Sequence, residues 1–183
     1  EAALKLYAEL ESDDPNDGVA ADRLATVRRN LDRRTDLLAL RKRQVARAQS
    51  AGVRLPLRLD AAAIESSLDQ IDAALALLRE NLGEEPRHRD SVAMTIDVLG
   101  AAMVGAALRA TGFAATPAIA ATAYAVGTLF AIIIPIFAGL LFVELSTIVV
   151  LRSLGVRDQQ AVAATILFRA GQTWFPFLVA LSV

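Results

Sequence analysis

Two oppositely charged residues in the apolar C-terminal part of the chain could do chemistry together. Glu144 lies in a run, residues 130–151, that carries no other charge, and Arg169 lies in the next apolar segment. An ionised side chain is costly in a lipid-like medium, so it usually pairs with an opposite charge or faces a water-filled cavity. We therefore expect Glu144 and Arg169 to form a buried ion pair. The pair would either contact a polar molecule in such a cavity or hold neighbouring helices together as a structural element.

Asp97 is a further charged candidate, which would face either a neighbouring helix or a substrate. The single histidine, His88, lies in the polar segment 84–90, where we expect it to be solvated. The chain has no cysteine, which excludes disulfides and cysteine-ligated metals. No nucleophile with a neighbouring base, metal-binding cluster or phosphate-binding glycine loop appears. We therefore expect no metal, no cofactor and no enzymatic activity in this chain.

Charge and hydropathy divide the chain into two halves that must position these residues. The chain is 55% hydrophobic and 21% charged, with a formal net charge of −1, but residues 91–183 hold few of the charges. This division predicts a soluble domain, residues 1–86, and a membrane domain, residues 87–183. A near-neutral net charge without a long basic run argues against a nucleic-acid partner. The arginine-rich stretch between residues 28 and 47 is either a solvated coiled-coil face or a contact for anionic lipids.

Hydrophobic spacing in the soluble half is helical throughout. Apolar residues from Ile64 to Leu82 recur at alternating steps of four and three, the spacing of a helix that packs against one partner. A longer helix over about residues 19–50 precedes it, and a glycine and a proline mark the connection 51–59. We therefore expect an antiparallel, coiled-coil-like helical hairpin with a short helix over residues 1–11 leading in. Such a hairpin would act as a spacer or an oligomerisation arm.

Four apolar stretches follow in the membrane half: 91–111, 117–134, 140–151 and 160–183. Three of them are long enough to cross about 30 Å of hydrocarbon, whereas the third is too short. Pro135 and Gly139 flank an expected break, which predicts a re-entrant segment that protein must cover or that lines a cavity. The expected fold is an all-α polytopic membrane helix bundle with this segment, preceded by the soluble hairpin. Because the chain begins at Glu1 and ends in an apolar stretch, we expect the bundle to continue beyond it.

A sequence motif connects these elements. The segment from Pro135 to Glu144 reads Pro-Ile-Phe-Ala-Gly-Leu-Leu-Phe-Val-Glu, a Gly155-Val156 turn follows, and an alanine-rich helix leads to Phe168-Arg169 and Trp174-Phe175-Pro176. Over about residues 90–183 this pattern resembles the membrane region of the lysylphosphatidylglycerol synthase/flippase family. That family typically shows Pro-x-Pro-Gly-Gly-Leu-Gly-x-x-Glu, then Gly-Val, Tyr-Arg and Tyr-Trp-x-Pro. The chain departs from it at Phe137, Ala138, Leu141 and Phe168.

The resemblance implies a flippase-like lipid translocase in the bacterial inner membrane. It would move or present the polar headgroup of a phospholipid or an isoprenoid-linked lipid, with a lipid-modifying protein or a second copy of the chain as partner. We expect six residues at the substrate site: Glu144, Arg169, Asp97, Trp174, Gly139 and Pro135. The alternative is a membrane-anchored helical interaction or scaffold protein without transport activity. Arg87 and Arg89 precede the first span while the loop 112–117 has neither Lys nor Arg, so the positive-inside rule places the hairpin in the cytoplasm.

Overall fold

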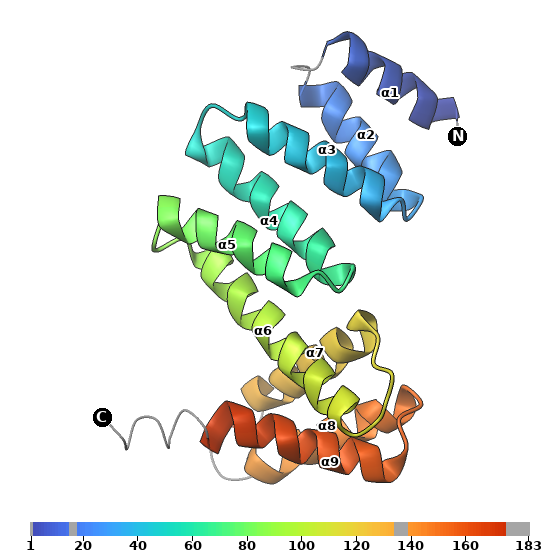
Figure 1. Ribbon diagram of the computed structural model, residues 1–183, viewed down its shortest axis with the longest axis vertical. Helices are drawn as coiled ribbons and strands as arrows, with labels where there is room; N and C mark the ends of the chain where they lie inside the picture. Colours follow the sequence, from blue (N-terminus) through green and yellow to red (C-terminus); the bar gives the residue numbers. More distant parts are fainter. Residues whose placement is uncertain (1, 15–17, 134–138, 175–183) are drawn as a thin grey trace. The chain divides into compact units, whose positions relative to one another are not determined.

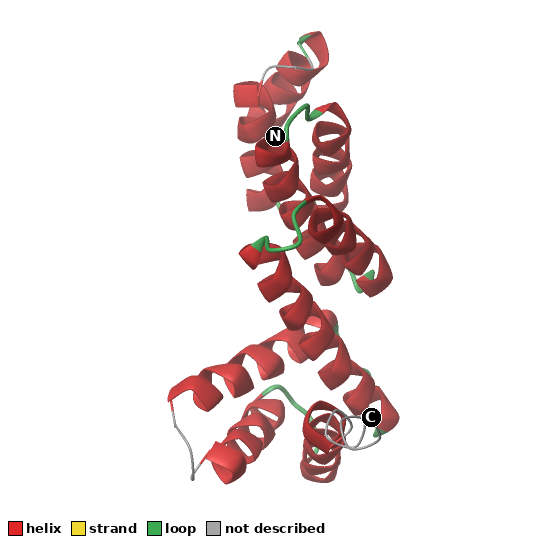
Figure 2. Cartoon of the chain, turned by 90° about the vertical axis from the view of Figure 1, so that its left-hand side faces the viewer, coloured by secondary structure: helices red, strands yellow, loops and turns green. Residues whose placement is uncertain are grey.

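The structure is a computed structural model that describes residues 2–14, 18–133 and 139–174. Within these ranges the chain is all helical and has no strand, as Figure 2 shows, so the all-α class is confirmed. The helices, labelled in Figure 1, are α1 (Ala2–Asp13), α2 (Gly18–Asn30), α3 (Arg34–Arg47), α4 (Ala51–Ser67), α5 (Ile71–Glu84), α6 (Arg89–Ala110), α7 (Pro117–Ile133), α8 (Gly139–Ser153), α9 (Asp158–Arg169) and the π-helical turn η1 (Ala170–Trp174).

The helices form two compact units. The N-terminal unit comprises Glu1–Glu65 and Asp72–Ser91, and the C-terminal unit comprises Ser66–Ile71 and Val92–Val183. The division falls close to the expected change from charged to apolar sequence. That these units are a soluble and a membrane domain stays a prediction.

The predicted hairpin of the N-terminal half is wrong, because its long helix is divided into α2 and α3. Asp32 has a left-handed backbone with φ of 53°. The Asp32 N–H donates to the Arg29 carbonyl at 3.1 Å and the Arg33 N–H donates to the Arg28 carbonyl at 2.9 Å. This pair of bonds is a Schellman motif, and aspartate tolerates the left-handed region better than most residues. The helical periodicity continues across the turn and therefore conceals it.

The predicted connection 51–59 is also wrong, because this segment forms the start of α4. Pro56 lies inside the helix, where it removes one N–H and its bond to the carbonyl four residues earlier. Leu55 beside it is 4% exposed, so burial of this side chain offsets the loss. The helix expected to run from Ile64 to Leu82 is interrupted instead at Asp69, which has φ of 63°.

Charged groups are buried together with leucines in the N-terminal unit. Arg41 donates from Nε to the Asp60 carboxylate at 2.6 Å, and Lys42 lies 2.6 Å from the carboxylate of Glu65. The Glu65 side chain is almost completely buried. A buried charge is tolerated when it is paired, and both of these contacts join α3 to α4.

His88 is not the solvated linker residue that the sequence predicts. It is half-buried, and its Nδ1 accepts a hydrogen bond of 3.3 Å from the Ser91 N–H. The Ser91 hydroxyl lies 2.8 Å from the same nitrogen and accepts from the Asn81 amide at 3.1 Å. The imidazole therefore caps the N-terminus of α6, a position at which free N–H groups need an acceptor.

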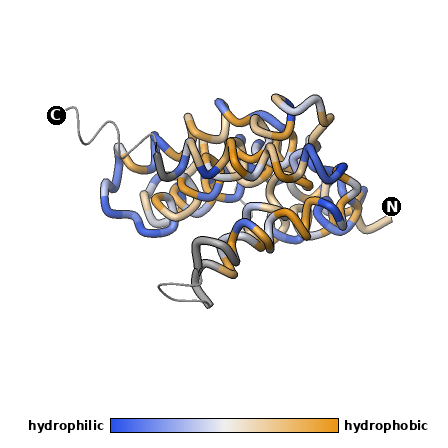
Figure 3. Tube along the Cα trace, turned by 90° about the horizontal axis from the view of Figure 1, so that it is seen from below, coloured by the Kyte–Doolittle hydropathy of each residue, from blue (hydrophilic) through white to orange (hydrophobic). Residues whose placement is uncertain are grey.

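The C-terminal unit agrees more closely with the predicted apolar stretches. Among the described residues, α6 is the one helix both long and apolar enough to cross a membrane, and Pro117–Phe130 is a shorter apolar helix. The 22 residues of α6 extend for about 33 Å at a rise of about 1.5 Å per residue. The α7 and α8 helices are the most apolar of the described helices, and Figure 3 shows the chain trace coloured by hydropathy. Several spans and a re-entrant segment stay predictions, and Pro135 lies outside the described residues.

The turns that close α6 and α8 have the same geometry. Gly112 and Gly155 have φ of 79° and 88°, a conformation that glycine adopts without steric cost. The N–H of the residue after each glycine donates to the carbonyl five residues earlier, at 3.1 Å from Phe113 and 3.0 Å from Val156. Both turns are Schellman motifs, and both were expected from the sequence.

The C-terminal unit exposes apolar side chains and packs small ones inside. Ile96 on α6, Val149 on α8 and Ile166 on α9 are each more than half exposed. In the interior, Gly100 lies against the Tyr124 ring and Gly127 lies against the Thr147 hydroxyl. Small residues between closely packed helices, with apolar side chains outside, are typical of helices that pack in lipid. A face of this kind in water would instead be an exposed apolar patch.

Candidate functional site

The expected ion pair is present and joins α8 to the end of α9. The Arg169 Nε donates to Glu144 Oε1 at 2.7 Å. Both side chains are half-buried, with 23% and 25% of their surfaces exposed. Salt and water screen the attraction within such a half-buried pair less than within a fully exposed pair.

Local sequence explains why α8 and α9 present these two groups to each other. The Gly155 turn reverses the chain, and Val156 behind it is buried at 3% exposure. Asp158 begins α9 and pairs with Arg152 of α8 at 2.8 Å, a favourable position for a carboxylate at a helix N-terminus. Arg169 occupies the last turn of α9, where a cation is favoured for the same reason.

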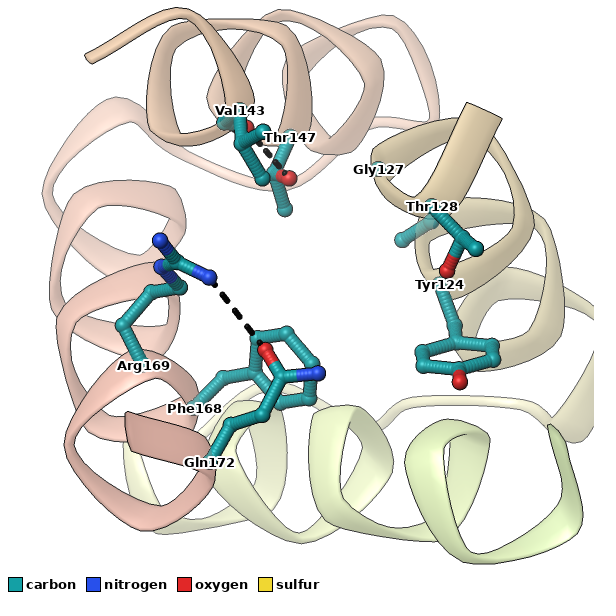
Figure 4. Close-up of a pocket in the computed structure, with 9 residues that line it drawn as sticks. Tyr124, Gly127, Thr128, Val143, Thr147, Phe168, Arg169 and Gln172 are labelled. Carbon is teal, nitrogen blue, oxygen red and sulfur yellow. Dashed lines mark hydrogen bonds between the residues drawn. The ribbon is translucent and has the colours of Figure 1, made fainter. Parts of the chain in front are cut away.

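A cavity of about 140 Å³ lies beside Arg169. Its walls come from α7, α8 and the junction of α9 with η1, and are lined by Ala123, Tyr124, Gly127, Thr128, Val143, Thr147, Phe168, Arg169 and Gln172. Figure 4 shows Arg169 and Gln172 on one side of the space and Tyr124 and Thr128 on the other. The cavity is thus apolar at Val143 and Phe168 and polar where Arg169 and Gln172 meet.

The π-helical turn positions the polar end of the cavity. Gln172 lies in η1, and its Oε1 accepts from Arg169 Nη1 at 3.4 Å (Figure 4). Phe168, one residue before Arg169, meets the Tyr124 ring edge-on, with 6.3 Å between the centroids and 87° between the planes. Turns of this type occur frequently at functional sites.

Glu144 supports the site and does not line it. Its Oε1 is bonded to Arg169, whereas its Oε2 is buried and has no hydrogen-bond partner among the described residues. A buried carboxylate oxygen without a partner is uncommon. Arg169 therefore supplies the charge that faces the cavity, and Glu144 holds the guanidinium in place.

The other expected site residues lie elsewhere or outside the described part of the chain. Asp97 is exposed on α6 and does not belong to the cavity wall. Gly139 is the first residue of α8 and Trp174 the last of η1, but the structure describes neither their surroundings nor the Trp174 side chain. Pro135 is not described. The substrate roles of all four residues stay predictions.

Sequence reasoning missed the uncharged polar residues of the cavity. Tyr124 and Thr128 are four residues apart on α7, so they share one face of that helix. Two polar residues at this spacing in an apolar helix are a usable signal. Thr147 gives a similar signal on α8, although its hydroxyl donates to the Val143 carbonyl at 2.8 Å.

Comparison with known proteins decides the family. The family model described as lysylphosphatidylglycerol synthase TM region matches residues 24–180 of the chain. The chain belongs to this family. The match confirms the resemblance carried by the motif, and it also extends into α2–α5, where the motif provided no indication. No curated protein and no solved structure matches the chain. The lysylphosphatidylglycerol synthase family places the chain among membrane proteins related to lipid handling.

Proposed function

We propose that the chain is a lipid translocase module of the bacterial inner membrane. In this proposal a polar lipid headgroup passes or is presented at the cavity beside the Glu144–Arg169 pair, while the acyl chains stay in the bilayer. The observation that carries the proposal is the cavity itself, whose wall contains a charged side chain within a unit that exposes apolar faces. A charge at membrane depth usually marks a path for a polar substrate.

Two observations, one geometric and one from the family, support the passage of a headgroup at this cavity. The guanidinium stays charged when buried, and Glu144 keeps it oriented through the 2.7 Å bond to Nε. The family also relates the chain to lipids. We propose that this chain binds and moves the headgroup without a chemical reaction, and that a partner protein performs any lipid modification.

The alternative of a scaffold protein with a coiled-coil arm has less support. A continuous seam from Ile64 to Leu82 would be needed for dimerisation through one helix face. The left-handed turn at Asp69 divides that seam between α4 and α5. Ile64 and Leu78 are buried inside the N-terminal unit, so neither side chain is available to a second copy.

A lipid-flipping assay with the protein reconstituted in proteoliposomes tests the proposal. We expect Arg169→Ala to lower the flipping rate of a fluorescent phospholipid by about tenfold or more, since a hydrogen bond to a charged group contributes about 1.5–3 kcal/mol. Glu144→Gln should lower the rate less, because the amide oxygen can still accept from Nε. Arg152→Gln is the control, because this arginine is exposed on α8 and its ion-pair partner among the described residues is the exposed Asp158. Flipping that is unchanged in both Arg169→Ala and Glu144→Gln would contradict the mechanism.

We also propose that the N-terminal unit faces the cytoplasm. Arg87 and Arg89 precede α6, whereas the turn between α6 and α7 contains no Lys or Arg. The chain has no cysteine, so single cysteines report topology without background. A membrane-impermeant thiol reagent added outside spheroplasts should label Ala114→Cys in that turn and leave Ser50→Cys unlabelled. Labelling of Ser50→Cys from outside would reverse the proposed orientation.

A further inference from the structure

The polar atoms in the cavity wall are mainly hydrogen-bond donors that have no partner within the described part of the chain. Arg169 uses Nε for Glu144 and one N–H of Nη1 for Gln172, which leaves the second N–H of Nη1, the nitrogen that Figure 4 shows pointing into the space. The hydroxyls of Tyr124 and Thr128 make no hydrogen bond with any described residue. Gln172 accepts through its oxygen and therefore keeps its amide N–H groups. Polar groups in a cavity normally bind water or a ligand.

The wall has a positive charge and, among the described residues, no carboxylate. Glu144 neutralises part of this charge through its bond to Arg169, but it does not belong to the cavity wall, so its oxygens offer no site for a cation there. An ammonium group in the cavity would lie next to a guanidinium and find only hydroxyl and amide oxygens. An oxyanion would meet several donors, including a guanidinium that can bond two oxygens.

We propose that this cavity binds the phosphate of an anionic headgroup and does not require an amine on it. The proposal rests on the translocase function proposed above and names its substrate class. Arg169 contacts the phosphate through the second N–H of Nη1, the nitrogen that points into the space in Figure 4, while Thr128 and Gln172 donate from the cavity wall. Glu144 is a positioning residue that holds the guanidinium through Nε. The cavity volume of about 140 Å³ suits a phosphate group, whereas a lysyl group esterified to the headgroup would extend beyond it.

Native mass spectrometry of the intact protein in detergent tests the assignment. The lipid probes are phosphatidylglycerol, lysylphosphatidylglycerol and diacylglycerol, which lacks phosphate. We expect phosphatidylglycerol to bind at least as tightly as the lysylated lipid, and diacylglycerol to bind weakest. Tighter binding of lysylphosphatidylglycerol that Glu144→Gln abolishes would overturn the proposal, since it would show that Glu144 takes the ammonium.

Matched variants separate binding from folding. We expect Arg169→Gln to weaken phosphatidylglycerol binding about tenfold or more and Thr128→Val about two- to tenfold, from the ordinary values for charged and neutral hydrogen bonds. Arg169→Lys keeps the charge without the planar fork and should fall between wild type and Arg169→Gln. Thr165→Val is the control, because Thr165 is buried on α9 outside the cavity and donates to the Ala161 carbonyl at 2.8 Å. Equal binding by wild type, Thr128→Val and Arg169→Lys would contradict the proposed contacts.

Competition with soluble glycerol phosphate distinguishes the phosphate of a lipid headgroup from that of a soluble molecule. If it fails to displace phosphatidylglycerol at a hundredfold excess, the site takes the phosphate as part of a lipid. If it displaces the lipid at comparable concentration, the anion site stands, but the lipid translocase function proposed above fails.

Discussion

Alanine in place of Gly100 should destabilise the C-terminal unit by pushing against the cavity wall. A Cβ at this position would lie 2.1 Å from Cε2 and 2.3 Å from Cζ of Tyr124. Carbon atoms in contact are separated by about 3.5–4.0 Å, so the ring must move by about 1.5 Å. Overpacking of this kind costs about 1–3 kcal/mol. Because Tyr124 lines the cavity, its displacement should also lower the flipping rate.

Gly105→Ala is the matched control on the same helix. Its new Cβ would lie 3.5 Å from the Ala120 Cβ, which is an ordinary contact. Alanine is also favoured over glycine within a helix by about 0.5–1 kcal/mol. We therefore expect the two substitutions to have opposite signs.

Thermal unfolding of the intact protein in detergent measures the difference. For a chain of this size about 1 kcal/mol shifts Tm by about 2–4 °C. Gly100→Ala should thus lower Tm by roughly 2–12 °C, whereas Gly105→Ala should leave it unchanged or raise it by a few degrees. Equal Tm values and equal flipping rates for the two variants would refute the packing of Gly100 against Tyr124.

Three further predictions concern single groups. Hydrogen bonds from Arg54 and, less strongly, from Arg58 lower the pKa of Glu84 from 4.5 to about 2. This carboxylate therefore stabilises the fold above pH 4.5, and its contribution is lost as the pH falls to about 2. Glu84→Gln should flatten that part of a Tm–pH curve, and an unaltered curve would argue against the contact. His88→Ala should speed amide hydrogen exchange at the start of α6, because about 1 kcal/mol of stabilisation by the cap is lost, whereas His88→Asn should keep exchange slow. Equal exchange rates in the two variants would exclude the cap. Gly155→Ala should destabilise the turn after α8 by about 1–2 kcal/mol, because a residue with a Cβ is strained at φ of 88°. The new Cβ would have no described atom within 4 Å, so backbone strain is the whole cost. An unchanged Tm would show that the turn can adopt another conformation.

The helices and turns of the C-terminal half could be predicted because few sequence features there favour any other structure. Apolar length defines α6 and α7, and Gly112 and Gly155 mark turns that require a left-handed residue. The Glu144–Arg169 pair was predictable for a similar reason, since two isolated charges in an apolar setting have few other partners. The cavity was not predictable, because it depends on how α7, α8 and η1 pack around Tyr124 and Thr128.

The N-terminal half shows the opposite situation. The hydrophobic period passes through Asp32 and Asp69 without interruption, and neither residue is a glycine, yet both adopt the left-handed conformation. Pro56 looks like a helix breaker but lies within α4, where burial of Leu55 outweighs one lost hydrogen bond. Tertiary packing overrides local preference at these positions. The contact between Lys42 and the buried carboxylate of Glu65 depends on the same packing and was therefore missed.

An experimental structure of the intact protein in a phosphatidylglycerol nanodisc would test the proposed headgroup site most directly. We expect phosphate density within about 3 Å of the Arg169 guanidinium, the length of a charge-assisted hydrogen bond, between α7, α8 and η1. We also expect Glu144 to contact Arg169 and not the headgroup, with apolar side chains such as Val149 facing the acyl chains. A cavity without a headgroup, with lipid ordered only on the outer apolar faces, would contradict the proposed site.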